Sequence, residues 1–234
     1  MVFIISVNYN ISNLFGGMPS LQDLEKPESE LSSELYSSDN ILLGKYFRYN
    51  RSPVKFDELS DELVTTLLVT EDIRFYEHSG IDLKGLVRAT YGVVKNVATF
   101  GSSGLEGGGS TITQQLAKNL FKIRREKKGK LSNVPFLGLI ISKVKEWIVA
   151  VKLEEFYTKK EILAMYLNTA EYGSNSYGIK VAAKTYFDKD PSELNYNESS
   201  IIVGLLNKPT KYNPFFNPEN ATEKRSEIFY NLYK

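Results

Sequence analysis

The stretch LLVTEDIRFYEHSG, residues 67–80, places a pair of acids, an aromatic residue, the only histidine of the chain and a glycine in a fixed order. Leucine and valine recur at helical spacing before it, so the pattern predicts an amphipathic helix over residues 57–77. The next position on the apolar face is an acid, Glu71, and Phe75 and His78 continue that face. Burial raises the pKa of a carboxylic acid in general, which suits a general acid or base near neutral pH.

Glu71 taken alone leaves two interpretations open. One is a general acid or base, and the other is a cap partner or one side of an ion pair, which is common for a glutamate near a helix end.

The composition limits the kinds of site that the chain can form. The 234 residues include no cysteine and one histidine, which excludes disulfides, thiolate metal sites and histidine-rich metal sites. Carboxylate-bound Mg²⁺ or Mn²⁺ remains compatible, and a net charge of +1 gives no argument for nucleic acid.

The first 40 residues differ in composition from the remainder. An apolar run, MVFIISV, stops at Asn8 and is either a strand or buried end, or the trimmed tail of a membrane anchor; no run is long enough to span a bilayer. Serine, asparagine, proline and acids dominate up to residue 40, which predicts an arm or linker with little core over residues 1–40. Residues 41–234 form the expected main domain, opening with a strand or hairpin before residue 56.

The next segments predict two helices joined by a loop. Asp82 suits the N-cap of a helix over residues 83–98. The following TFGSSGLEGGGS, residues 99–110, is either a substrate-gated flap or a flexible connector. Thr111 and Gln114 have capping-box spacing and predict a helix over residues 112–121.

Glycines followed by Ser, Thr and Gln at a helix N-terminus make a good anion site, because free N–H groups and the positive end of the dipole meet there. A basic run follows this helix and is either a solvated face or complementary to a phosphate-bearing ligand or an acidic membrane surface. The basic residues of this region are Lys118, Lys122, Arg124, Arg125, Lys127, Lys128 and Lys130.

A largely apolar pattern predicts a central, buried helix over residues 139–157. Glu146 lies on it between lysines, and a buried acid needs a partner. Glu146 either forms an ion pair with Lys143 or Lys145, or it faces Glu71 across a cleft as a second carboxylate. Further cap signals predict helices that start after Thr158, Asn195 and Asn217, and another that runs to about Phe187.

Five stretches in order resemble the peptidoglycan glycosyltransferase family, the transglycosylase domain of class A penicillin-binding proteins and of monofunctional transglycosylases. EDIRFYEHSG is similar to its motif Glu-Asp-x-x-Phe-x-x-His-x-Gly, GGSTITQQLAKN to its second motif, and SKVKE to its third, Arg-Lys-x-x-Glu. ILAMYLN and residues 198–214 resemble the fourth and fifth. The resemblance covers roughly residues 40–234. It departs from the family where Ser142 replaces the usual Arg, in a longer segment before the third motif, and in the wording of the fifth.

The resemblance implies a mainly α, lysozyme-like fold with a head lobe and a smaller membrane-facing jaw, in which Val93, Val94, Val97 and Phe100 enter lipid. It also implies polymerisation of lipid II with release of undecaprenyl pyrophosphate. Glu71 is then the general base, and Glu146 holds a divalent cation (Mg²⁺ or Mn²⁺) on the pyrophosphate or orients lysines. The implied substrate and pyrophosphate donors are Arg88, Ser110, Thr111, Gln114, Gln115, Lys118, Arg124 or Arg125, Lys143 and Lys145. The implied structural motif residues are Asp72, Phe75, His78, Gly80, Asn119 and Asn168.

The implied place of action is the outer face of the bacterial cytoplasmic membrane, with lipid II, the growing glycan chain and a transpeptidase domain or other cell-wall synthesis proteins as partners. Two alternatives stay open: a lysozyme-like glycoside hydrolase or lytic transglycosylase, and a non-catalytic module that binds lipid II. The cationic cluster around the second and third motifs distinguishes a glycosyltransferase from the hydrolase, because a hydrolase has no pyrophosphate to hold.

Overall fold

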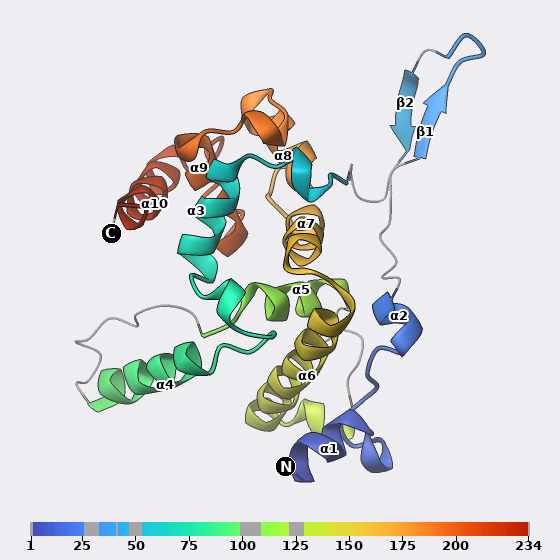
Figure 1. The fold of residues 1–234 in the computed structure, drawn as a ribbon, viewed down its shortest axis with the longest axis vertical. Helices are drawn as coiled ribbons and strands as arrows, with labels where there is room; N and C mark the ends of the chain where they lie inside the picture. Colours follow the sequence, from blue (N-terminus) through green and yellow to red (C-terminus); the bar gives the residue numbers. More distant parts are fainter. Residues whose placement is uncertain are drawn as a thin grey trace. The chain divides into compact units, whose positions relative to one another are not determined.

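The computed structural model describes residues 2–25, 33–40, 42–46, 53–98, 109–121 and 129–233. Helices dominate these residues, so the expected mainly α class is confirmed (Figure 1). The chain divides into two compact units. Unit 1 comprises Met1–Pro27 and Glu71–Ile162, and unit 2 comprises Glu28–Thr70 and Leu163–Lys234. The head lobe and jaw concern the arrangement of parts and stay a prediction, as does a domain boundary at residue 40.

Unit 1 is built on α6, Pro135–Phe156, against which α5, Ile112–Leu120, packs. The sequence predicted α6 to begin at residue 139, but Pro135 at its first position lets it start earlier. The buried part of α6 is mostly apolar, as its pattern predicted, but it also includes Lys145 and Glu146. The helix α4, Leu83–Ala98, has the predicted bounds and follows its predicted N-cap, since the Gly85 N–H donates to Asp82 Oδ1 at 2.9 Å.

The N-terminal residues also belong to unit 1, through α1, Val2–Asn8, and α2, Leu21–Glu25, which both pack on α6. Val7 and Phe15 are buried in one cluster with apolar residues of α6. The prediction of an arm with little core is therefore wrong for residues 2–25. Of the interpretations of the apolar run, the strand is wrong because the run is a helix, the buried end agrees with Val7, and the anchor tail stays a prediction. Serine and asparagine in this segment close turns, as when Asn10 Oδ1 accepts from the N–H groups of Phe15 and Gly16.

Unit 2 holds most of α3, Asp61–Glu71, most of α7, Lys159–Thr169, and the helices α8, Ile179–Phe187, α9, Tyr196–Asn207, and α10, Pro218–Asn231. The predicted cap of α9 is confirmed, because Asn195 Oδ1 accepts from the Glu198 N–H while the Glu198 carboxylate accepts from the Asn195 N–H. A strand or hairpin was predicted between residues 40 and 56. The strand β2, Leu42–Tyr46, lies there, but its antiparallel partner β1, Ser33–Tyr36, precedes that range.

The helix predicted over residues 57–77 is too long at both ends. Ser60 starts α3 by accepting from the Leu63 N–H at 3.1 Å. The chain leaves the helix after Glu71, because the Asp72 carboxylate contacts His78 and the N–H of Ile112. Phe75 and His78 therefore do not continue the face of α3. Short 3-10 helices cover Phe56–Glu58 and Phe75–Glu77 on either side, and others cover Ile11–Asn13, Lys130–Asn133 and Pro191–Glu193.

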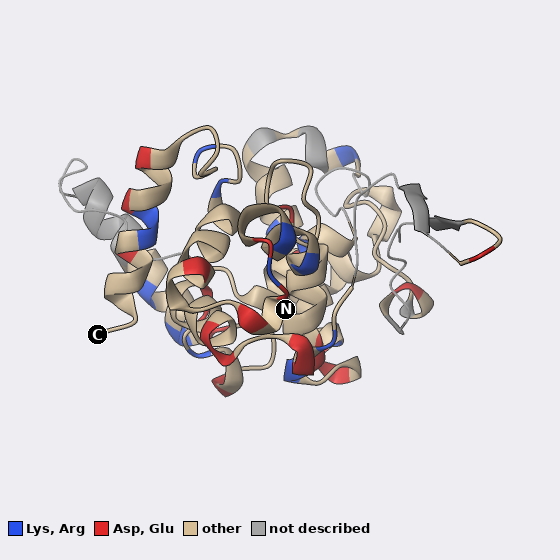
Figure 2. Ribbon diagram, turned by 90° about the horizontal axis from the view of Figure 1, so that it is seen from above, with Lys and Arg blue, Asp and Glu red and all other residues tan. Residues whose placement is uncertain are grey.

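Acidic and basic positions are both spread along the described helices (Figure 2), in keeping with the net charge of +1. Within the ranges that the structure describes, no helix is both long enough and apolar enough to cross a membrane.

Candidate active site

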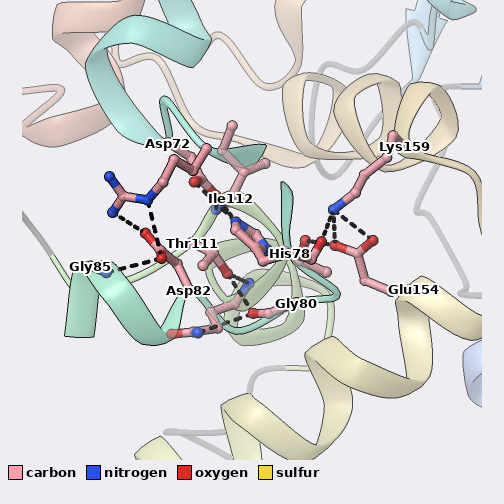
Figure 3. Close-up of polar contacts among 12 residues, drawn as sticks. Asp72, His78, Gly80, Asp82, Gly85, Thr111, Ile112, Glu154 and Lys159 are labelled. Carbon is pink, nitrogen blue, oxygen red and sulfur yellow. Dashed lines mark hydrogen bonds and ion pairs between the residues drawn. The ribbon is translucent and has the colours of Figure 1, made fainter. Parts of the chain in front are cut away.

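Asp72 joins the turn after α3 to the start of α5 (Figure 3). Its carboxylate is buried, and both of its oxygens lie 3.1 Å from His78 Nε2. Oδ2 also accepts the N–H of Ile112 at 3.1 Å. Ile112 is the first residue of α5, where backbone N–H groups lack helical partners and negative charge is favoured. Asp72 therefore fixes the first motif to the second.

Gly80 makes a second junction between the same segments. Its carbonyl accepts from Thr111 Oγ1 at 2.8 Å and from Gln114 Nε2 at 3.1 Å. Its φ is +87°, and a Cβ there would lie 2.8 Å from the carbonyl carbon of Ala150. Thr111 caps α5 as predicted by accepting from the Gln114 N–H. The Gln114 side chain leaves the other half of the capping box unmade, because it binds Gly80 instead.

Lys159 and Glu154 complete this scaffold, and sequence reasoning missed both (Figure 3). Lys159 Nζ donates to the His78 carbonyl at 2.6 Å and pairs with a Glu154 oxygen at 2.8 Å. It also lies 4.2 Å from the ring centroid of Phe75, which is buried. Thr113 Oγ1 donates to Glu154 from α5 at 2.6 Å. The pair spans the turn between α6 and α7, so no pattern within a single helix could single it out.

Glu71 ends α3 and is half-buried. Its Oε2 accepts from Gln115 Nε2 at 2.8 Å. Gln115 was expected to bind the pyrophosphate, and in this structure its amide contacts the candidate base. The contact joins the first and second motifs at the Glu71 carboxylate.

Lys143 links α6 to the residue before the cap of α5. Its Nζ donates to Ser110 Oγ at 2.6 Å and pairs with Glu146 at 2.9 Å. Glu146 is only 1% exposed, so of the two interpretations its ion pair with a neighbouring lysine is the one seen. Lys145 is equally buried, and its Nζ donates to the Gly17 carbonyl at 3.2 Å. Lys145 thus holds the N-terminal segment onto α6.

The donor set around Glu146 fits a metal ion poorly. The described residues include no group of three histidine, cysteine, aspartate or glutamate side chains placed to share a cation. The Glu146 carboxylate already contacts the ammonium of Lys143, which a bound cation would repel. Of the two expected roles of Glu146, orienting Lys143 is the one that this geometry suits.

The remaining predicted residues are placed less centrally. Arg88 is exposed on α4, Lys118 is half-buried in the last turn of α5, and Asn119 beside it is exposed. Asn168, in unit 2, exchanges two hydrogen bonds with the backbone of Val54. Other predictions lie outside the described residues: Arg124 and Arg125, the rest of the basic run over 122–128, the flap over 99–108 including Phe100, and the side chains of Val93, Val94 and Val97.

The first three motifs therefore converge within unit 1. The half-buried Glu71 carboxylate has one oxygen held by the neutral amide of Gln115 in α5. Just before α5, the Ser110 hydroxyl contacts the ammonium of Lys143. Such a site can accept a proton at Glu71 and stabilise negative charge near Ser110. The family model described as Transglycosylase matches residues 39–233.

The chain belongs to the transglycosylase family. Its resemblance to that family, first seen in the motifs, is thereby confirmed. Among its relatives, penicillin-binding protein 1A of Vibrio cholerae is 33% identical over 232 residues, covering 96% of this chain and 26% of that protein. Penicillin-binding protein 1A of Aquifex aeolicus is 34% identical over 228 residues, covering 97% and 28%. That of Haemophilus influenzae is 37% identical over 203 residues, covering 87% and 22%.

A crystal structure of penicillin-binding protein 1A from Haemophilus influenzae also matches, with a TM-score of 0.43 and 21% identity over 88% of this chain and 18% of that one. This transglycosylase chain spans about a quarter of the length of the relatives it matches.

Asp82, which precedes α4, gives a test of this local structure through pH. Burial alone raises the pKa of Asp82, but hydrogen bonds from Arg74 and the Gly85 N–H outweigh it and hold the pKa below its usual range. The ionised carboxylate therefore stabilises the fold above about pH 4, and this contribution is lost as pH falls through the lowered value. We expect Asp82→Asn to lower the free energy of unfolding by about 0.5 kcal/mol at pH 7, because asparagine still caps α4 but loses the charge that pairs with Arg74.

Urea denaturation of both proteins at pH 7 and at about pH 3.5 measures the effect, and the difference between them should shrink at the lower pH. A difference that stays constant or grows as the solution is acidified would contradict the role given to the Asp82 charge.

Proposed function

We propose that this chain is a peptidoglycan glycosyltransferase that polymerises lipid II into glycan strands and releases undecaprenyl pyrophosphate. Membership of the transglycosylase family supports glycosyl transfer. The observation that carries the assignment of the base is the Glu71 carboxylate, half-buried and held by Gln115 beside the start of α5.

The proposed reaction is an inverting displacement. Glu71 accepts the proton of the 4-hydroxyl of the acceptor sugar as that oxygen attacks C1 of the growing chain. The bond from C1 to the phosphate oxygen breaks on the opposite face, and its electron pair leaves with undecaprenyl pyrophosphate. The new bond joins C1 to the acceptor oxygen with the configuration inverted.

The start of α5 suits the developing charge on the leaving group. Ser110 and Lys143 lie together there, and the dipole of α5 is positive at this end. Thr111 and Gln114 already bind the Gly80 carbonyl, so we assign them to positioning this helix. Lys118 and Arg88 remain proposed pyrophosphate donors.

We further propose that the chain acts at the outer face of the bacterial cytoplasmic membrane, where the lipid tail of its substrate resides. Exposed apolar side chains on two helices that pack together support this. The exposed residues on α1 are Val2, Phe3, Ile4 and Ile5, and those on the first turns of α6 are Phe136 and Leu139. The relatives' greater length and their name suggest a transpeptidase domain as partner in the same polypeptide.

Replacing Glu71 with Gln tests the base. We expect glycan synthesis from lipid II to fall by about 10²–10⁴-fold, because the amide cannot take the proton, while lipid II binding stays within about threefold. Product ladders on a gel and a binding titration in detergent measure the two quantities. Glu77→Gln is the matched control, because Glu77 is an exposed glutamate of the same motif and should retain activity.

Near-normal turnover by Glu71→Gln would contradict the assignment of the base. Cleavage of preformed peptidoglycan in place of ladders would favour the hydrolase. Tight lipid II binding without ladders from the unmodified chain would favour a non-catalytic module.

Replacing Phe136 and Leu139 together with Ser tests the membrane surface. Both side chains are exposed, so the fold should persist while binding to phosphatidylglycerol-containing vesicles falls several-fold. Flotation in a density gradient measures the bound fraction. The control replaces two exposed aromatics near the C-terminus, Tyr230 and Tyr233, with Ser. Equal flotation of the parent chain and the Phe136/Leu139 variant would contradict this surface.

A further inference from the structure

Gln115 donates a hydrogen bond to the carboxylate of Glu71, which accepts the proton in the proposed reaction. We propose that Gln115 is a positioning residue that orients the Glu71 carboxylate for proton transfer, in place of the pyrophosphate contact that its motif suggested. The inference rests on the proposed function, because it assigns a task only if Glu71 is the base.

The amide of Gln115 is held on a rigid support. Its helix, α5, is fixed at its first residue by Asp72 and through its cap, Thr111, to the Gly80 carbonyl. Glu71, by contrast, is the last residue of its helix, and a half-buried glutamate has three side-chain torsions to fix. The 2.8 Å hydrogen bond from Gln115 Nε2 therefore fixes the Glu71 carboxylate relative to α5.

The chemistry of the contact suits a base. A neutral amide orients a carboxylate without the ion pair that an ammonium would form, and an ion pair would weaken its affinity for a proton more strongly. Lys143, a cation of the same unit, contacts Ser110 and Glu146. Within the described residues, Glu71 Oε1 has no hydrogen-bond partner, which leaves that oxygen for the acceptor hydroxyl.

Two consecutive glutamines in α5 thus have different tasks. Gln114 is buried, and its amide donates to the Gly80 carbonyl. Gln115 is half-buried on the same face as Lys118, three residues on, where the helix is open enough to meet Glu71. The contact with the base, made by Gln115, and a proposed pyrophosphate donor, Lys118, therefore lie on the same side of α5.

Replacing Gln115 with Leu tests the inference on the full chain with lipid II as substrate. We expect kcat to fall about tenfold or more while KM changes by less than about threefold. Gln22→Leu is the matched control, because Gln22 is exposed on α2 and should keep both constants. Thermal melting of each variant reports whether the fold persists.

Gln115→Glu gives a second readout that a purely structural role would not produce. At acidic pH the new carboxyl is protonated and can donate to Glu71, so activity should exceed that of Gln115→Leu. At alkaline pH two adjacent carboxylates repel, and activity should fall to or below that of Gln115→Leu.

Two results would overturn the inference while leaving the proposed function intact. One is a Gln115→Leu enzyme with unchanged kcat, and the other is a tenfold or larger rise in KM alone, which would return Gln115 to substrate binding. Absence of glycan ladders from the unmodified chain would instead overturn the proposed function, and this inference with it.

Discussion

The carboxylate of Asp72 is the interaction on which the candidate site depends. It is buried between the imidazole of His78 and the first N–H of α5, so it draws the chain out of α3 directly after Glu71. A buried carboxylate is stable only when its oxygens are hydrogen-bonded, and these two partners supply that. Glu71 and the beginning of α5, both in unit 1, are consequently fixed to each other.

The contacts of the site follow from that junction. Gly80 and Thr111 hold the turn against the cap of α5, and Lys159 holds the His78 carbonyl from the other side. Once α5 is placed, Gln115 reaches Glu71 and Ser110 reaches Lys143. The proposed general base and the proposed anion-stabilising helix start then lie in one unit of the fold, which is the arrangement that the proposed glycosyl transfer from a pyrophosphate needs.

Local signals predicted the helices well, because caps depend on residues three positions apart. Asp82, Thr111 and Asn195 each cap the helix that the sequence assigned to them. The same reasoning failed after Glu71, where helical spacing continued into residues that a contact with α5 pulls away. Long-range contacts of this kind are invisible to periodicity.

The motifs singled out residues of the candidate site without predicting their contacts. Glu71 and Gln115 were both singled out, yet only the structure brings the Gln115 amide to the Glu71 carboxylate. Lys145 and Lys143 read alike in sequence, but one turns to the Gly17 carbonyl and the other to Ser110. The pairing of Glu154 with Lys159 depends on the turn between two helices, which the sequence does not encode locally.

The most direct measurement on the Asp72 junction combines turnover and amide exchange in Asp72→Ala. If the carboxylate places Glu71 through α5, kcat for lipid II polymerisation should fall about 10–100-fold, and the Ile112 amide should exchange faster, in a protein that circular dichroism shows to be folded. Normal turnover with an equally protected Ile112 amide would contradict the account, because the site would then be positioned without the contact from which it is built.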